Sequence, residues 1–250
     1  MDKKKEDDGQ VEVSLILPAY NEAGNLEKAV EEVTRTLEEI TRSYQIIIAE
    51  DGSTDGTDKI GSELARKHAS VMHIHSDRRL GRGQALKNAV CKAEGKILVY
   101  MDVDLATDLG QLKALVSSVR EGYDFATGSR MLPESSVGRS LSRKMASKWY
   151  NFMVRTLLDS KVRDHQCGFK SCRRDSLLQI LEEVTASHWF FDTELLVRAS
   201  RKGYTIKEIP VDWRSGEKTT VNLLRDSLIM GSQVLKLRWK LRSQGPSNET

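Results

Sequence analysis

Short apolar segments alternate with longer amphipathic segments along the first part of the chain. The apolar segments are continuous rather than interrupted by polar residues, which is typical of strands buried on both faces of a parallel sheet. The expected strands are Val13–Leu17, Gln45–Ala49, Val71–His75 and Lys96–Met101, and the expected helices lie at about 24–40, 57–68 and 83–93. This alternation predicts an α/β fold, a single Rossmann-like domain with a mainly parallel sheet flanked by helices.

Polar segments bound this pattern at both ends of the chain. Residues 1–10 and 243–250 lack the apolar side chains that a packed core requires, and we expect both to be disordered. The α/β domain is expected over residues 11–220, and an amphipathic C-terminal helix over residues 221–242.

Composition narrows the class of protein. The 250 residues include 39 Lys and Arg against 36 Asp and Glu, and this balance argues against binding nucleic acid through bulk positive charge. No apolar stretch approaches the ~20 residues needed to cross a bilayer, and the first residues lack the apolar part of a secretory signal. The three cysteines lack metal-binding spacing, which indicates a reducing compartment. We therefore expect a cytoplasmic globular protein.

Three of the expected strands end in polar turns. The turns are 18–22 (PAYNE), 50–57 (EDGSTDGT) and 102–104 (DVD). Each alone is adequately explained as a solvated loop or a helix cap. The carboxyl ends of parallel strands meet at one edge of a sheet, where α/β proteins bind ligands, so the three turns together predict a binding site.

Asp102 and Asp104 are the sharpest pair at this edge. Residues i and i+2 at a strand end point to the same face, so both carboxylates can converge on one point. With no basic neighbour expected, they would repel each other unless a cation lay between them. Mg²⁺ or Mn²⁺ suits such oxygen ligands and leaves positions for phosphate oxygens. The pair is therefore a candidate metal site.

Asp51 and the loop at 79–84 (RLGRGQ) each have two interpretations. Asp51 can help to cap the following helix, or it can bond a nucleobase or ribose. The loop, with two arginines among glycines, is either a surface turn or a phosphate-facing loop at a helix N-terminus.

Five blocks of sequence follow one another in a characteristic order: LPAYNEAGNL, IIIAEDGSTDGT, RRLGRGQALKNAV, AEGKILVYMDVDL and Gly128-Ser129-Arg130. Together they resemble the family 2 glycosyltransferases of the GT-A fold, over about residues 11–220. Within that family the chain looks most like the dolichyl- and polyprenyl-phosphate sugar synthases. The segments 163–170 (RDHQCGFK), 189–196 (WFFDTELL) and 208–213 (EIPVDW) are most similar to dolichyl-phosphate β-glucosyltransferases.

The resemblance implies roles for individual residues. Catalytic roles fall on Asp104, Arg130 and Asp192, and metal ligation falls on Asp102 and Asp104. The acceptor phosphate would be bound by Arg130, Arg143 and Ser147. The implied nucleotide-binding residues are Pro18, Tyr20, Glu22, Glu50, Asp51, Arg82 and Asp102.

The sequence departs from the family pattern at several points. Glu50 stands where many relatives have Asp, and His165 replaces a Thr common in the glucosyl subgroup. Ala106 stands where mannosyl-phosphate synthases usually have Gln, which favours glucose over mannose. The N-terminal membrane anchor of the eukaryotic glucosyltransferases is not found here, which favours a prokaryotic protein.

Residues 139–158 form a basic amphipathic stretch without an acidic residue. Its cations are Arg139, Arg143, Lys144, Lys148 and Arg155. On a helical wheel its apolar residues face one side, and these are Leu141, Met145, Trp149, Phe152, Met153 and Leu157. Such a helix either lies in a membrane interface or packs on its own domain.

Residues 221–242 carry two apolar stripes on nearly opposite faces. The first contains Val221, Leu224, Leu228, Leu235 and Trp239, and the second contains Leu223, Met230, Val234, Leu237 and Leu241. One stripe can pack on the domain, and the other needs a membrane surface or a second subunit of a homo-oligomer. We favour the membrane.

These features predict an inverting, metal-dependent glycosyltransferase that is peripherally associated with the membrane. It would move a hexose, with glucose favoured, from UDP-glucose or GDP-mannose to dolichyl or polyprenyl phosphate. A lipid phosphate is already anionic at neutral pH, so Asp192 would orient groups rather than accept a proton. One alternative is a soluble or polysaccharide hydroxyl acceptor with Asp192 as the base. Another is a non-catalytic scaffold that binds nucleotide sugars.

Overall fold

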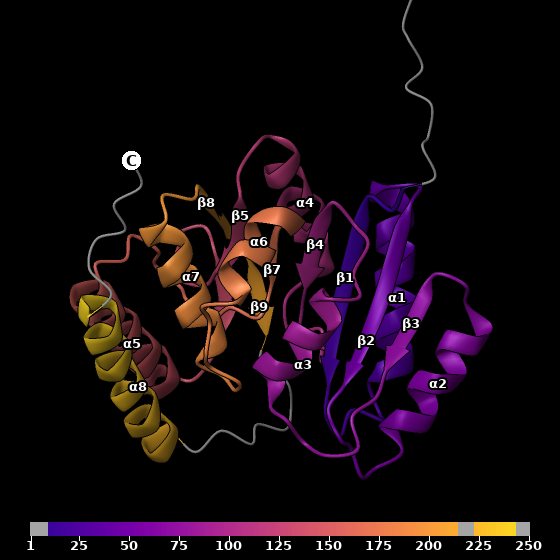
Figure 1. The fold of residues 1–250 in the computed structure, drawn as a ribbon, viewed down its shortest axis with the longest axis horizontal. Helices are drawn as coiled ribbons and strands as arrows, with labels where there is room; N and C mark the ends of the chain where they lie inside the picture. Colours follow the sequence, from indigo (N-terminus) through magenta and orange to yellow (C-terminus); the bar gives the residue numbers. More distant parts are fainter. Residues whose placement is uncertain (1–9, 215–222, 244–250) are drawn as a thin grey trace, which may run out of the picture.

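The computed structural model describes residues 10–214 and 223–243 (Figure 1). Nearly all of the two expected tails, and residues 215–222, lie outside the described residues. The elements are β1 (Val13–Ala19), α1 (Leu26–Ile40), β2 (Tyr44–Glu50), α2 (Thr57–Lys67), β3 (Val71–Ile74), α3 (Arg82–Val90), β4 (Ile97–Tyr100), η1 (Leu109–Gln111), α4 (Leu112–Arg120), β5 (Phe125–Ser129), β6 (Ser136–Gly138), α5 (Leu141–Leu158), β7 (Lys170–Arg173), α6 (Arg174–Leu181), α7 (Phe191–Arg201), β8 (Ile206–Pro210), β9 (Asp212–Arg214) and α8 (Leu223–Ser243).

A seven-stranded sheet runs through the molecule in the order β3-β2-β1-β4-β7-β5-β8 (Figure 1). β1 pairs in parallel with β2 and β4, β2 with β3, and β5 with β8. Among the described strands of this sheet, β7 alone runs the other way, antiparallel to both β4 and β5. The carboxyl ends of β1, β2, β4 and β5 therefore meet at one edge, together with the amino end of β7. We call this the carboxyl edge.

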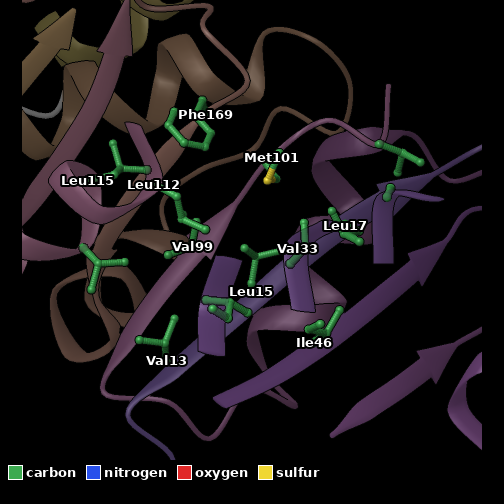
Figure 2. Packing of buried hydrophobic residues seen from close by; sticks show 14 of the residues in the cluster. Val13, Leu15, Leu17, Val33, Ile46, Val99, Met101, Leu112, Leu115 and Phe169 are labelled. Atoms are coloured by element: carbon green, nitrogen blue, oxygen red, sulfur yellow. The ribbon is translucent and has the colours of Figure 1, made fainter. Parts of the chain in front are cut away.

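Successive residues of β1 enter two different cores, one on each face of the sheet. Val13, Leu15 and Leu17 pack with α1 and α4 in the cluster that Figure 2 shows in part. Ile16 packs in a second cluster with residues of α3, α6 and α7. All four side chains are fully buried. Because neighbouring residues of a strand point to opposite faces, a continuously apolar strand supplies both helical layers.

α5 and α8 lie side by side at one end of the molecule (Figure 1). Their contact forms a third cluster, which contains Tyr150, Val154, Leu158, Phe190, Val197, Val234, Leu237 and Leu241. No helix within the described ranges is both long and apolar enough to cross a membrane. Large apolar side chains nevertheless remain exposed on α5, namely Leu141, Met145, Trp149 and Phe152, and on α8, namely Ile229, Leu235 and Trp239.

The α/β fold with a mainly parallel sheet is confirmed, and so are the strands and helices expected up to residue 101. The first strand continues beyond its expected end, through Pro18 to Ala19. The predicted apolar face of α5 is wrong at two positions. Met153 and Leu157 were expected on the same side as Trp149, but they pack into the cluster with α8 because that helix covers their side of α5.

The C-terminal helix is confirmed over Leu223–Ser243. Its stripe through Met230, Val234 and Leu237 packs on the domain, as expected of one of its two apolar faces. Leu235 and Trp239, from the other stripe, are exposed. Val221 and the side chains of Leu223, Leu224 and Leu228 lie outside what the structure describes.

Candidate active site

The three acidic turns meet at the carboxyl edge, as the sequence predicts. β1 carries Pro18 and ends at Ala19, between β2, which ends at Glu50, and β4, which ends at Tyr100. β5 is parallel to these strands and brings Arg130 to the same edge. The edge therefore holds carboxylates at the ends of three neighbouring strands and an arginine at the end of a fourth.

Asp51 holds the loop that leads into α3. Its buried carboxylate accepts hydrogen bonds from the backbone N–H of Leu80 at 2.7 Å and of Gly81 at 2.9 Å. Gly81 has a φ of +102°, and a Cβ there would overlap the ring of His188, so glycine is required. The next residue, Arg82, is the first residue of α3, and the anchored loop places its side chain at the carboxyl edge.

Arg82 bridges two carboxylates. Its Nη2 and Nε lie 2.9 and 3.2 Å from Oδ1 of Asp102, and its Nη1 lies 2.6 Å from Oδ2 of Asp192. Burial by itself would lower the pKa of Arg82, but the two carboxylates raise it above its ordinary value. The expectation that Asp102 and Asp104 have no basic neighbour is wrong, because the loop anchored by Asp51 places Arg82 on Asp102.

Asp192 lies in the first turn of α7, surrounded by donors. Besides Arg82, the hydroxyl of Tyr100 donates to it at 2.8 Å, and Nζ of the buried Lys170 lies 3.1 Å away. Burial raises the pKa of Asp192, but the charges of Lys170 and Arg82 outweigh burial, so the pKa is lowered overall. A carboxylate held in this way is a weak proton acceptor at neutral pH.

Negative charge is concentrated around Asp104 and Glu22. Burial raises the pKa of Asp104, and the charge of Asp102 adds to the rise. Burial likewise raises the pKa of Glu22, with Asp104 and Asp102 acting in the same direction. Leu105, directly after Asp104, has a φ of +51°, a left-handed conformation that leucine rarely adopts. These groups would be stabilised in their charged form by a nearby cation.

The donor set fits a metal that is only partly held by protein. Within the described residues, no group of three or more His, Cys, Asp or Glu side chains could enclose a metal ion. Mg²⁺ commonly binds through one or two carboxylates and completes its coordination with phosphate oxygens and water. Asp102 and Asp104 match that pattern, and 42% of the Asp102 side chain is accessible.

Gly168 packs its backbone directly against the carboxylate of Asp102. A Cβ on residue 168 would overlap both carboxylate oxygens. Gly168 precedes β7, the antiparallel strand, so the amino end of β7 supports the residue that follows β4. With a larger residue at this position, either Asp102 or the backbone before β7 would have to move.

Tyr20 and Glu50 lie at the ends of β1 and β2, where a nucleotide is expected. Arg79 stacks on Tyr20, with its guanidinium carbon 3.9 Å from the ring centroid. Glu50 accepts a hydrogen bond from the backbone N–H of Ser53 and contacts Nδ1 of His75. Burial raises the pKa of Glu50, but these hydrogen bonds lower it overall. Glu50 and Asp51, at the start of the second turn, therefore hold the backbone of loops in place.

Arg130 is fixed by Asp164. Nε of Arg130 lies 2.7 Å from Oδ2 of Asp164, Nη2 lies 2.9 Å from Oδ1, and the backbone N–H of Arg130 also donates to Oδ2. Burial raises the pKa of Asp164, but Arg130 lowers it far below its ordinary value. The pair is almost completely buried, so the plane of the guanidinium is set by the fold.

Arg139 lies near the three residues expected to bind the acceptor phosphate. Its Nη1 donates to Oγ of Ser147 at 2.8 Å, and its guanidinium carbon lies 4.2 Å from the ring centroid of Trp213. Its Nε is buried with no hydrogen-bond partner among the described residues. Burial lowers the pKa of Arg139 to about 10, and the charges of Arg130 and Arg143 act in the same direction. An anion bound here would stabilise this cation.

Four residues of the site could not be assigned a role from the sequence, namely Tyr100, Lys170, Asp164 and Arg139. Asp164 and Lys170 both belong to the block RDHQCGFK, and Tyr100 ends the strand before Asp102. Tyr100 was the available signal, because a tyrosine hydroxyl at the end of a buried strand requires a hydrogen-bond partner. The partner itself could not be inferred, since Asp192 is distant in the sequence.

His165 has a structural role. It is fully buried, its Nδ1 lies 2.9 Å from Oδ1 of Asn151, and its Nε2 lies 2.8 Å from Oγ of Ser160. Burial lowers its pKa to about 3, so the ring is neutral at physiological pH. Asn151 also donates to the backbone oxygen of Ser147, so His165 helps to position the first half of α5.

Comparison with known proteins gives consistent matches. A family model described as Glycosyl transferase family 2 matches residues 14–181. The chain is 48% identical over 234 residues to Glycosyltransferase AglD of Haloferax volcanii, covering 92% of this chain but 38% of AglD. It is 31% identical over 231 residues to a dolichyl-phosphate beta-glucosyltransferase of Trichomonas vaginalis, covering 87% of this chain and 70% of that protein.

A solved structure has the same fold at low sequence identity. Glucosyl-3-phosphoglycerate synthase from Mycobacterium tuberculosis, in complex with Mn²⁺, UDP and phosphoglyceric acid, superimposes with a TM-score of 0.67. The two chains are 20% identical, and the match covers 91% of this chain and 76% of the synthase. The likeness supports the GT-A fold.

Proposed function

Because the chain belongs to glycosyl transferase family 2, we propose that it transfers a hexose from a nucleotide diphosphate sugar to a polyprenyl phosphate, with inversion at the anomeric carbon. The observation that carries the proposal is a separation of charge along the carboxyl edge. Carboxylates gather after β4, and arginines gather after β5 and at the start of α5. Only β7 lies between β4 and β5, so the strand axes are roughly 10 Å apart. A donor diphosphate and an acceptor phosphate fit these two regions.

The nucleotide would lie over the ends of β1 and β2, beside Pro18, Tyr20 and Glu22. Support comes from the glucosyl-3-phosphoglycerate synthase structure, which contains UDP. Glu50 and Asp51 already hold backbone groups, so they would shape the nucleotide pocket by fixing the loops around it.

Asp102 and Asp104 would hold a divalent cation, Mg²⁺ or Mn²⁺, which when bound neutralises charge on the leaving diphosphate. Arg82 contacts Asp102 and would lie close to the same diphosphate. Its guanidinium also faces the exposed ring of Trp189 at 5.7 Å. Arg82 would therefore bind the donor diphosphate and hold it at the centre of the carboxyl edge.

The nucleophile would be an oxygen of the acceptor phosphate. A phosphomonoester has a second pKa of about 6, so it is anionic at neutral pH without a general base. Arg130, Arg139, Arg143 and Ser147 would bind this phosphate and orient it toward the sugar. Asp192 would act as a positioning residue for Arg82, in keeping with its lowered pKa. A hydroxyl acceptor would instead require a base.

The proposed transfer is tested with a panel of substrates. The chain is incubated with UDP-glucose or GDP-mannose, with polyprenyl phosphate or phosphoglycerate, and with Mg²⁺ or Mn²⁺, and products are identified by mass spectrometry. We expect a polyprenyl phosphate hexose as the product, formed fastest from UDP-glucose. Transfer to the soluble acceptor alone would contradict the lipid acceptor. Nucleotide binding without turnover on any acceptor would indicate the scaffold alternative.

We also propose that α5 and α8 bring the protein to a membrane from the cytoplasmic side. Trp149 and Phe152 are 61% and 66% exposed, and Trp239 is 76% exposed. Tryptophan at the surface of a basic helix is typical of a membrane interface. Replacing Trp149 and Trp239 with Ser should reduce flotation with vesicles while leaving far-ultraviolet circular dichroism unchanged. If the same variant instead converts a dimer to a monomer in sedimentation, these faces bind a second subunit.

A further inference from the structure

A basic pocket lies on the flank of α5, separate from the arginines assigned to the acceptor. It has a volume of about 360 Å³ and is lined by Lys148, Asn151 and Arg155 of α5, by Met131 after β5, and by Arg163 before β7. No carboxylate lines it. In the described parts of the chain, the side chains of Lys148, Arg155 and Arg163 take part in no ion pair or hydrogen bond.

Two of these cations border an exposed apolar stripe. Leu141, Met145, Trp149 and Phe152 follow one another at three- or four-residue spacing, so they share one face of α5, and each is more than 60% exposed. Lys148 lies four residues before Phe152, and Arg155 lies three residues after it. Both therefore lie beside the stripe on a helix of 3.6 residues per turn. A membrane in which the apolar stripe is inserted would place its charged headgroups next to these cations.

Buried contacts fix the rest of the pocket. Asn151 is 4% exposed, and its Oδ1 accepts a hydrogen bond from the backbone N–H of His165 at 3.0 Å. Glu208 accepts hydrogen bonds from the backbone N–H of Arg163 and of Asp164, so its carboxylate is engaged by the backbone. The position of the pocket between three segments is therefore set by the fold, while its cations face an open volume.

We propose that this pocket binds the phosphate of an anionic lipid headgroup in the membrane that the stripe contacts. The proposal rests on the membrane placement given under the proposed function. Three cations around one volume repel one another, and a phosphate among them removes that repulsion and can accept several charge-assisted hydrogen bonds. A headgroup is favoured over free phosphate because the apolar stripe beside the pocket brings the lipid and holds it there.

The test is sedimentation of the full chain with vesicles in the absence of donor sugar and polyprenyl phosphate. Vesicles are made of phosphatidylcholine alone or mixed with phosphatidylglycerol. The triple variant Lys148→Gln, Arg155→Gln, Arg163→Gln is compared with a variant of equal net charge, Arg66→Gln, Lys67→Gln, Lys113→Gln, whose substitutions lie on α2 and α4. Both variants are checked by circular dichroism.

Each cation removed from the pocket should weaken binding to the mixed vesicles roughly fivefold, so the triple variant should lose about a hundredfold. The control variant should stay within about twofold of the wild type. Equal losses in the two variants would overturn the proposal in favour of general charge attraction. If inorganic phosphate binds the pocket as tightly as the mixed vesicles do, the proposal that the ligand is a lipid headgroup is contradicted. Because no transfer is measured, failure of the proposed glycosyl transfer would leave this comparison unaffected.

Discussion

Arg82 and Asp192 form a buried ion pair between residues 110 positions apart, with 2.6 Å between Nη1 and Oδ2. Arg82 begins α3, Asp192 lies in the first turn of α7, and both helices cover the same face of the sheet. The same guanidinium holds Asp102. The position of a candidate metal ligand therefore depends on a carboxylate that the chain supplies much later.

Replacing Asp192 with Asn removes the charge that holds Arg82 and Lys170. With a polyprenyl phosphate acceptor we expect kcat to fall roughly 10- to 100-fold, because Arg82 loses one of its two carboxylate partners. The pH–rate profile between about pH 6 and 9 should keep its shape, because Asp192 is ionised throughout and takes no proton. Tyr100→Phe removes one hydrogen bond but leaves both ion pairs, and should cost far less. A loss of several orders of magnitude in Asp192→Asn, with substrate binding intact, would show that Asp192 is a base.

Replacing Asp104 with Asn removes one of the two carboxylates proposed for the metal. We expect Mn²⁺ binding, measured by titration calorimetry in the presence of UDP, to weaken at least tenfold, and turnover to fall by roughly 100-fold or more. Asp175→Asn, at an exposed site in the first turn of α6, is the matched control and should change neither quantity. Unchanged metal-dependent turnover in Asp104→Asn would remove Asp104 from the metal site.

Replacing Gly168 with Ala inserts a methyl group where the carboxylate of Asp102 lies. We expect the free energy of unfolding to fall by about 1–3 kcal/mol, because either the backbone before β7 or Asp102 must move. Metal affinity should fall as well. Gly24→Ala is the control, since nothing lies near the added Cβ and the backbone is not left-handed. Equal stability of the two variants in urea titrations would mean that the carboxyl edge accommodates a Cβ at residue 168 without loss of stability.

Replacing Arg139 with Gln removes the cation whose buried Nε has no partner. We expect the KM for polyprenyl phosphate to rise roughly tenfold or more, with the KM for the nucleotide sugar unchanged, because the residue lies on the acceptor side. Arg139→Lys should recover part of the loss, and Arg66→Gln on α2 should behave as wild type. A rise in the donor KM instead would assign Arg139 to the other half of the site.

His165 gives the folded state a specific sensitivity to acid. Its pKa is about 3 in the folded protein against about 6.5 for an unperturbed histidine. Between these values the unfolded chain binds a proton that the folded chain does not, so stability falls as the pH falls. The loss is about 1.4 kcal/mol per pH unit once the pH is below 6.5. In urea titrations from pH 7 to pH 4, His165→Asn should show a shallower dependence on pH. Parallel curves would mean that His165 gains a proton without unfolding.

The N-terminal half of the fold could be predicted because its strands are continuously apolar. Leu15 and Ile16 point to opposite faces and are both buried, which is the pattern that a strand between two helical layers requires. The polar turns after these strands then fall at one edge by topology alone. That much of the site follows from local sequence.

The rest of the site depends on contacts between distant residues. β7 (KSCR) is short and contains polar residues, so no period marks it as a central strand. Lys170 is buried there because Asp192 neutralises it, and Arg82 reaches Asp102 because Asp51 holds the preceding loop. Each of these pairings joins segments that pattern analysis treats separately.

The position of β7 also limits how the protein can evolve. β7 lies between β4 and β5 but follows both along the chain. A recombination breakpoint anywhere between Arg130 and Phe169 would place the two neighbours of β7 in one parent and β7 itself in the other. Mismatched pairing at the centre of the sheet would then disturb the support of Asp102 by Gly168 as well. A chimera with a breakpoint in this interval is therefore expected to lose the packing that holds Asp102 in place, even where each parent folds well.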